Sequence, residues 1–169
     1  MAGARPLAPW RWIGVPLVQC LILTVLFSLP FRPFGLSLPE PIFPMVPAFA
    51  WAVIRPSMLA PAGVLLMGLF LDILWGAPMG LWALSLLLVY GAALIGRSMM
   101  AGQSFPVMWA WYVAATGLAL GAAFLFTMVG AHATADPIAV AWQFLATIIL
   151  FPFAHLLIDR FEDADVRFR

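Results

Sequence analysis

The chain has 169 residues, of which 65% are hydrophobic and only 9% are charged. A soluble domain carries roughly 25% charged residues and 45–50% apolar ones, so a water-soluble fold of this length is excluded. The formal net charge of +1 offers no electrostatic basis for nucleic-acid binding. We therefore expect a single integral membrane domain over residues 1–169, with no separate soluble domain.

Six apolar runs, separated by proline, glycine or arginine, follow one another along the chain. A membrane-spanning helix needs about 20 predominantly apolar residues, and the chain has room for six of them. The predicted fold is therefore all-α, a polytopic membrane protein built as a six-transmembrane-helix bundle. Its predicted spans are 12–29, 41–54, 58–75, 81–95, 106–129 and 137–158.

The first predicted span could be a signal peptide or a retained anchor, and the last predicted span contains a proline. The first run follows Arg5 and Arg11, as the apolar part of a signal peptide would. It is as long as a full span and lacks a clear small-residue cleavage site, so we expect a retained anchor. In the last span, Pro152 predicts a kink, because proline removes a backbone donor from the helix.

The second span, 41–54, is short for a membrane crossing and contains Pro44 and Pro47. A re-entrant segment, which enters and leaves on the same side, is the alternative. The span reaches full length only if it begins near Leu36, and Glu40 then lies within it. Both interpretations stay open at this point.

The arginines predict the orientation, because cytoplasmic loops are enriched in basic residues. With six spans and the N-terminus inside, only Arg32 lies outside and both termini are cytoplasmic. The cytoplasmic arginines are then Arg5, Arg11, Arg55, Arg97, Arg160, Arg167 and Arg169. If the second run does not cross, the best alternative places the N-terminus, with Arg5 and Arg11, outside. Six crossings fit the arginines better.

A lone aspartate, Asp72, lies inside the third span, close to its end. A carboxylate at a span centre is unfavourable by about 2.5–3.5 kcal/mol, so it faces protein or water. Gly68, Asp72 and Gly76 share one side of the predicted helix at spacing i, i+4, i+8. That side lacks bulk, so another helix can approach it closely. Asp72 is predicted either to contact a partner or ligand, or only to fix the fold through a neighbouring helix.

The sequence contains no pattern typical of an enzyme or of a metal centre. No phosphate loop, dinucleotide fingerprint or nucleophile elbow is present. His132 and His155 fall at opposite faces of the membrane in the six-span arrangement, so they cannot share a metal ion. We expect no catalytic residues, no cofactor and no metal.

The stretch from Arg55-Pro56 through 68–84 resembles the rod shape-determining protein MreD family. The residues that carry the resemblance are Arg55-Pro56, Gly68-Leu-Phe-Leu-Asp72 and Ile73-Leu-Trp-Gly-Ala-Pro-Met-Gly-Leu-Trp-Ala-Leu84. The resemblance implies a fold similar to the substrate-binding subunits of energy-coupling-factor vitamin transporters, which are six-helix bundles. The family's distinctive positions fall on Gly68, Asp72, Gly76, Pro78 and Gly80.

The resemblance also implies partners and a location. MreD binds MreC, which has one span and a periplasmic domain. The wider elongation complex includes MreB filaments, RodZ, the glycosyltransferase RodA and its partner transpeptidase. We therefore expect a non-enzymatic scaffold of the bacterial inner membrane, surrounded by membrane lipids, that helps to control cell shape and lateral peptidoglycan synthesis.

Two hypotheses for function follow. In the first, the small-residue face of the third and fourth spans accepts the single span of MreC, and Asp72 captures a polar or basic group. In the second, the chain is a small-molecule (vitamin-like) binding subunit of a transporter, with polar side chains around an outer cavity. The available polar side chains are Glu40, Asp72, His132, Asp136 and Gln143.

Overall fold

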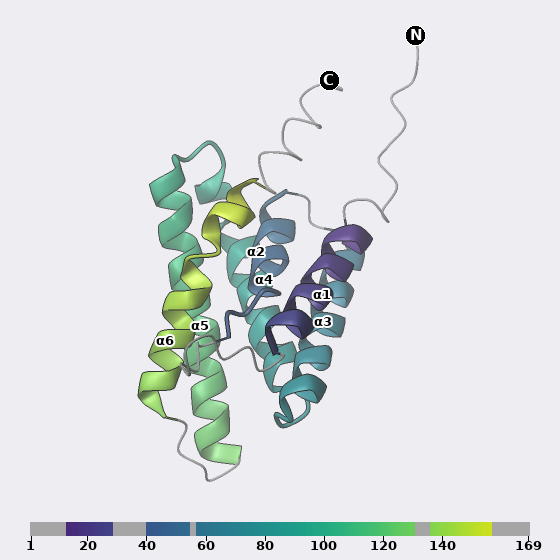
Figure 1. Ribbon diagram of the computed structural model, residues 1–169. Coiled ribbons are helices and arrows are strands. Elements are labelled where there is room, and N and C mark those ends of the chain that lie inside the picture. The colour runs from purple at the N-terminus through teal and green to yellow at the C-terminus, as the bar shows by residue number, and fades with distance from the viewer. Residues whose placement is uncertain (1–12, 29–39, 55–56, 131–135, 157–169) are drawn as a thin grey trace.

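The computed structural model describes residues 13–28, 40–54, 57–130 and 136–156. Within these residues the chain forms six helices and no strand, which confirms the all-α class. The helices are α1 Val15–Ser28, α2 Met45–Ile54, α3 Leu59–Trp75, α4 Leu81–Met100, α5 Phe105–Gly130 and α6 Pro137–Ile148 (Figure 1). Among the described residues, three segments are long and apolar enough to cross a membrane: Leu81–Met100, Phe105–Val129 and Pro137–Leu156. They indicate a multi-pass membrane protein.

Helices α1 and α3 run in the same direction. At one end, Ile13 and Leu17 lie against Gly63 in the first turns of α3. At the other end, the indole nitrogen of Trp75 donates to the hydroxyl of Ser28 over 3.3 Å. The end of α1 and the start of α3 therefore lie toward opposite ends of the bundle (Figure 1).

Helix α2 begins at Met45, four residues after the predicted start of the second span at residue 41. Its ten residues cover about 15 Å, half the thickness of the hydrocarbon layer. The preceding residues 40–44, which we call the entry segment, are not α-helical. Pro41 and Pro44 explain this, because each lacks a backbone donor and disfavours helical geometry in the residue before it.

The entry segment is buried within the protein, which is where membrane proteins tolerate irregular backbone. Ile42 is fully buried, and its N–H donates to the hydroxyl of Thr147 on α6 over 3.2 Å. The N–H groups of Phe43 and Met45 bond to carbonyls of the segment itself, each over 3.1 Å. These bonds satisfy the backbone donors that an interrupted helix would otherwise leave exposed to lipid.

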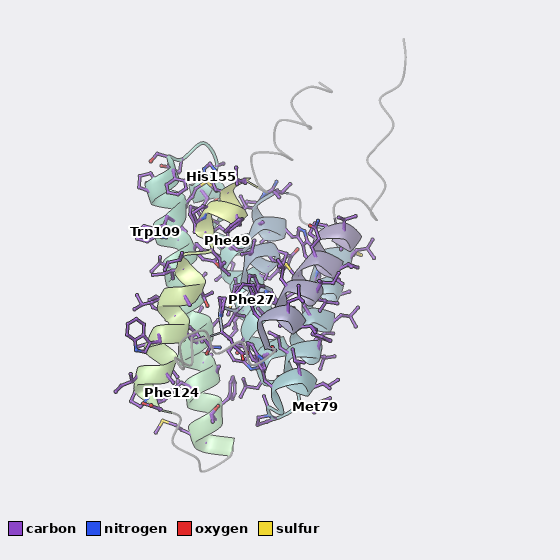
Figure 2. The ribbon with its side chains drawn as sticks, viewed as in Figure 1. Phe27, Phe49, Met79, Trp109, Phe124 and His155 are labelled. Carbon is purple, nitrogen blue, oxygen red and sulfur yellow. The ribbon has the colours of Figure 1, made fainter. Side chains whose placement is uncertain are left out.

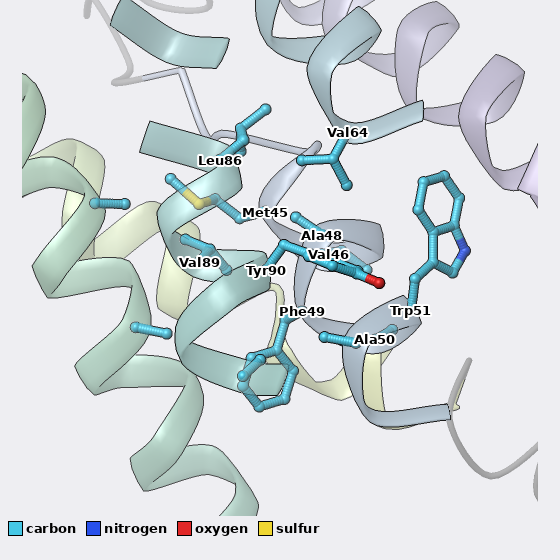
Figure 3. Close-up of a cluster of buried hydrophobic side chains, with 14 of the residues drawn as sticks. Met45, Val46, Ala48, Phe49, Ala50, Trp51, Val64, Leu86, Val89 and Tyr90 are labelled. Carbon is cyan, nitrogen blue, oxygen red and sulfur yellow. The ribbon is translucent and has the colours of Figure 1, made fainter. Parts of the chain in front are cut away.

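Helix α2 is the centre of the hydrophobic core. All its residues from Met45 to Val53 are buried. Figure 3 shows its side chains among Val64 from α3 and Leu86, Val89 and Tyr90 from α4. The ring of Phe49 meets Tyr112 of α5 edge-on, with centroids 5.3 Å apart. Because α2 is surrounded by other parts of the protein, it need not be as long as the hydrocarbon layer is thick.

Helix α4 continues to Met100, so the predicted end at residue 95 is wrong. Gly96 lies within the helix because it packs against Trp111, whose ring would be 2.9 Å from an added Cβ. The guanidinium of Arg97 donates to the carbonyls of Val53 and Ile54, over 2.9 and 3.3 Å. Arg97 thereby caps the C-terminal end of α2, where a positive charge is favourable.

The predicted kink at Pro152 is confirmed. Helix α6 ends at Ile148, and helical geometry resumes at residues 151–156. Because Pro152 has no N–H, it cannot donate to the carbonyl of Ile148. The indole of Trp109 on α5 donates to that carbonyl instead, over 3.4 Å. Residues 157–158 of the predicted span lie outside the described part of the chain.

Candidate functional site

Asp72 is buried at the corner between α3 and α4, with only 1% of its surface exposed. Its two carboxylate oxygens each accept one backbone N–H over 2.8 Å, one from Gly80 and one from Trp82. These donors belong to the start of α4, where the first N–H groups of a helix have no partner within it. Asp72 therefore caps α4 from the preceding helix, and its negative charge is favourable there.

The turn at 76–80 brings the start of α4 onto this carboxylate. Gly76 and Gly80 have φ angles of 63° and 95°, in the left-handed region that favours glycine. The backbone carbonyl of Asp72 accepts the N–H of Ala77 over 3.0 Å, which closes the end of α3. The backbone of Asp72 thus ends one helix while its side chain begins the next.

Gly68 allows α3 and α4 to approach closely. A Cβ atom built on Gly68 would overlap the backbone of Ala83 and lie 2.9 Å from the carbonyl carbon of Trp82. No side chain fits between these backbones. The predicted small-residue face exists at Gly68 and Asp72, and the helix that occupies it is α4 of the same chain.

This packing corrects the hypothesis that Gly68 and Asp72 receive a partner's span. Both residues are buried against α4, and the carboxylate already accepts two backbone donors. The spacing along α3 predicted a close approach correctly but did not identify the approaching helix. The approaching helix is α4 because a short turn of only five residues connects it to α3.

The rest of the motif lies on the surface. Gly76 and Pro78 are exposed, and Gly80 is half-buried. Met79, which has no distinctive signal in the sequence, is 71% exposed. Figure 2 shows Met79 at the tip of the hairpin, at the end of the bundle opposite His155. We call residues 76–79 the corner tip and this end of the bundle the corner end.

A polar and aromatic cluster adjoins the corner. The ring of Trp82 meets Trp75 edge-on, with centroids 5.1 Å apart. Trp75 donates to the hydroxyl of Ser28, and that hydroxyl donates to the carboxylate of Glu40 over 3.3 Å. The amide of Gln143 donates to the backbone carbonyl of Glu40 over 3.4 Å. These contacts join α1, α3, the entry segment and α6 beside the corner.

The polar residues expected to line a small-molecule site form hydrogen bonds within the protein, where the structure describes them. Asp72 caps α4, and Glu40 and Gln143 bond to protein groups. Asp136 is exposed and caps α6 by accepting the N–H of Ile138 over 2.9 Å. His132 and the Arg55-Pro56 step lie outside the described residues.

Across the described residues, no group of three or more His, Cys, Asp or Glu side chains is placed to hold a metal ion. His155 lies instead in an aromatic cluster, with its ring centroid 5.0 Å from that of Phe105 and 6.0 Å from that of Phe151.

Comparison of the chain with known protein families, with curated proteins and with solved structures finds no match. The similarity of residues 55–84 to MreD therefore stays a prediction from the sequence motif, as does the expected likeness to the vitamin-transporter subunits.

Proposed function

We propose that this chain is a non-enzymatic scaffold of the bacterial inner membrane that acts in the rod elongation complex and binds MreC directly. The supporting observation is that the motif positions 68, 72, 76 and 80 together build one hairpin corner. Gly68 allows the close approach, Asp72 caps α4, and Gly76 and Gly80 form the turn. A corner held in this way presents its tip in one fixed conformation, as a docking surface requires.

The proposed topology has six crossings with both termini in the cytoplasm. It is supported by the parallel direction of α1 and α3, since the entry segment and α2 return the chain across the bundle. The arginine distribution supports the same orientation. The corner end then faces the periplasm, and Arg97 lies near the cytoplasmic face.

Single cysteines test this topology. In a Cys20→Ala background, Gly35→Cys is expected to react with a membrane-impermeant maleimide applied to spheroplasts, and Ala4→Cys only after permeabilisation. Six crossings place residue 35 outside and residue 4 inside. The five-crossing alternative places residue 4 outside, so labelling of Ala4→Cys in intact spheroplasts would contradict the proposal.

The proposed contact for MreC is the corner tip and not the buried Gly68 and Asp72. The exposed apolar surface of Pro78 and Met79 lies at the end assigned to the periplasm, where the single span of MreC meets its periplasmic domain. The wider partners, MreB, RodZ, RodA and its transpeptidase, are proposed to join through MreC or other surfaces. No observation on the described residues specifically favours the small-molecule carrier.

Exchange of one exposed methionine tests the tip. Met79→Ser is expected to reduce the amount of MreC that co-purifies with the tagged protein several-fold, because it removes apolar contact area at the tip. Met58→Ser is the matched control, since Met58 is 96% exposed and lies before α3, at the other end of the bundle. The measurement is quantitative blotting of MreC after gentle detergent extraction, at equal membrane levels of each variant.

Two results would contradict the proposal. Equal recovery of MreC with both variants would remove the tip from the interface. Failure of the unaltered protein to retain any MreC would remove MreC as the direct partner.

A further inference from the structure

Two helices lie at the sides of the core and are buried along little of their length. Helix α1 buries only Pro16, Cys20 and Thr24 of its 14 residues. Helix α6 buries only Thr147 of its 12 residues. Figure 1 shows them on either side of α2. Elements with few buried contacts open at a lower free energy than the rest of a protein, so the polar contacts that fasten them matter more.

The contacts of α6 with the entry segment are hydrogen bonds. The hydroxyl of Thr147 accepts the N–H of Ile42 over 3.2 Å and itself donates to the carbonyl of Gln143 over 2.7 Å. The amide of Gln143 donates to the carbonyl of Glu40 over 3.4 Å. Two neighbouring turns of α6 therefore hold two successive parts of the entry segment.

The contacts of α1 with the entry segment lie on the same few residues. The thiol of Cys20 donates weakly to the carbonyl of Phe43 over 3.9 Å. The ring of Phe27 packs against that of Phe43, with centroids 5.0 Å apart. The hydroxyl of Ser28 donates to the carboxylate of Glu40 over 3.3 Å. Helix α1 thus depends on Glu40 and Phe43, and α6 on Glu40 and Ile42.

We propose that the entry segment is a mechanical link between α1 and α6, so that releasing it from α6 also loosens α1. Pro41 and Pro44 flank Ile42 and Phe43, and proline restricts both its own φ angle and the residue before it. A stiff segment cannot shift at Ile42 without moving Phe43. Movement of α6 at its break near Pro152 therefore reaches α1 on the other side of α2. This inference does not depend on the identity of any partner.

The single native cysteine reports on α1. Cys20 is 9% exposed, so a thiol reagent reaches it only when α1 opens. Thr147→Val keeps the shape of the side chain but removes the acceptor for the N–H of Ile42. Because an unpaired buried donor costs about 1–3 kcal/mol, the alkylation rate of Cys20 in the purified full chain is expected to rise about tenfold.

Two threonine variants are the controls. The hydroxyl of Thr127 donates to the carbonyl of Ala123 within α5, as that of Thr147 does to Gln143 within α6. Thr127→Val is therefore expected to leave the alkylation rate of Cys20 unchanged. Thr147→Ser, which keeps the hydroxyl, is expected to react at nearly the rate of the unaltered protein.

A second reporter separates the link from general loosening. In a Cys20→Ala background, Ala93→Cys places a thiol on α4 at a position that is 1% exposed. Thr147→Val is expected to leave the alkylation of this thiol unchanged. If Cys20 is unaffected by Thr147→Val, or if both reporters accelerate equally, the proposed link is overturned. Should Thr147→Val fail to fold, Gln143→Leu releases the carbonyl of Glu40 and is expected to give a smaller, equally selective rise.

Discussion

Replacing Asp72 by alanine is expected to lower the free energy of unfolding by about 3 kcal/mol. The substitution leaves the N–H groups of Gly80 and Trp82 without their acceptor, and hydrogen bonds to a charged group contribute about 1.5–3 kcal/mol each. The two bonds share one carboxylate, so their contributions do not simply add. Trp75 and Trp82 lie next to the corner, and tryptophan fluorescence during unfolding in detergent measures the effect.

Asp136→Ala is the matched control for this prediction. Asp136 also caps a helix, by accepting the N–H of Ile138, but it is exposed and belongs to the helix that it caps. Its loss is expected to cost about 1 kcal/mol or less. The loss of stability in Asp72→Asn is expected to fall between those of Asp72→Ala and Asp136→Ala. Asparagine keeps one acceptor oxygen but places an amide donor against the second backbone N–H. Equal effects of Asp72→Ala and Asp136→Ala would show that Asp72 does not hold the corner.

The stability measurements separate the role of Asp72 from that of the corner tip. Met79→Ser leaves every hydrogen bond of the corner in place, so it is expected to reduce MreC recovery without changing stability. Asp72→Ala is expected to reduce both, because the tip loses its support. Loss of MreC with undiminished stability in Asp72→Ala would instead favour a direct contact of the carboxylate with the partner.

Much of the helical layout follows from apolar runs and from the prolines and glycines that bound them. The predicted span 58–75 agrees with α3 and 106–129 with α5, each to within one residue. Both runs are long, and their ends coincide with residues that stop or start a helix on local grounds. Pro152 likewise predicted the interruption of α6, because the missing donor is a property of proline itself.

The errors in the helical layout arise where tertiary contacts override local signals. Gly96-Arg97 reads as a helix end, but Trp111 covers the glycine and α2 supplies acceptors for the arginine. The run 41–54 reads as one short helix, but its first four residues belong to the buried entry segment, in which the N–H of Ile42 needs the hydroxyl of Thr147 on α6. Neither the contacts of Gly96 and Arg97 nor the bond to Thr147 can be identified from the sequence, because each joins residues of different elements.

The candidate site was predicted in part. The sequence indicated that Gly68, Asp72 and Gly76 share one face that meets another helix, and the structure places Gly68 and Asp72 against α4 but leaves Gly76 exposed in the turn. It did not distinguish a foreign helix from α4, since small-residue patterns specify close approach and carry no information on the occupant. Met79 was missed because an exposed methionine in a turn has no distinctive local signal.

Gly68→Ala is expected to lower the free energy of unfolding by about 2–3 kcal/mol, the upper part of the range for overpacking a tight contact. The added methyl group would overlap the backbone of Ala83, so α3 and α4 must separate and weaken both bonds of Asp72. The matched control is Gly91→Ala on α4, where no atom lies within 4 Å of an added Cβ. At that position the substitution is expected to be neutral or to stabilise the protein by up to about 1 kcal/mol, because alanine has a higher helix propensity than glycine.

The two glycine variants also test which helix packs against the small-residue face. If α4 occupies it, Gly68→Ala destabilises the purified chain in the absence of any partner, and unfolding in detergent detects the loss. If a partner's span occupied it, the purified chain would tolerate the methyl group as well as Gly91→Ala does, and only MreC recovery would fall. The backbone of Ala83 is too close for a side chain of any size, so we expect the first result, with Gly68→Val more severe than Gly68→Ala.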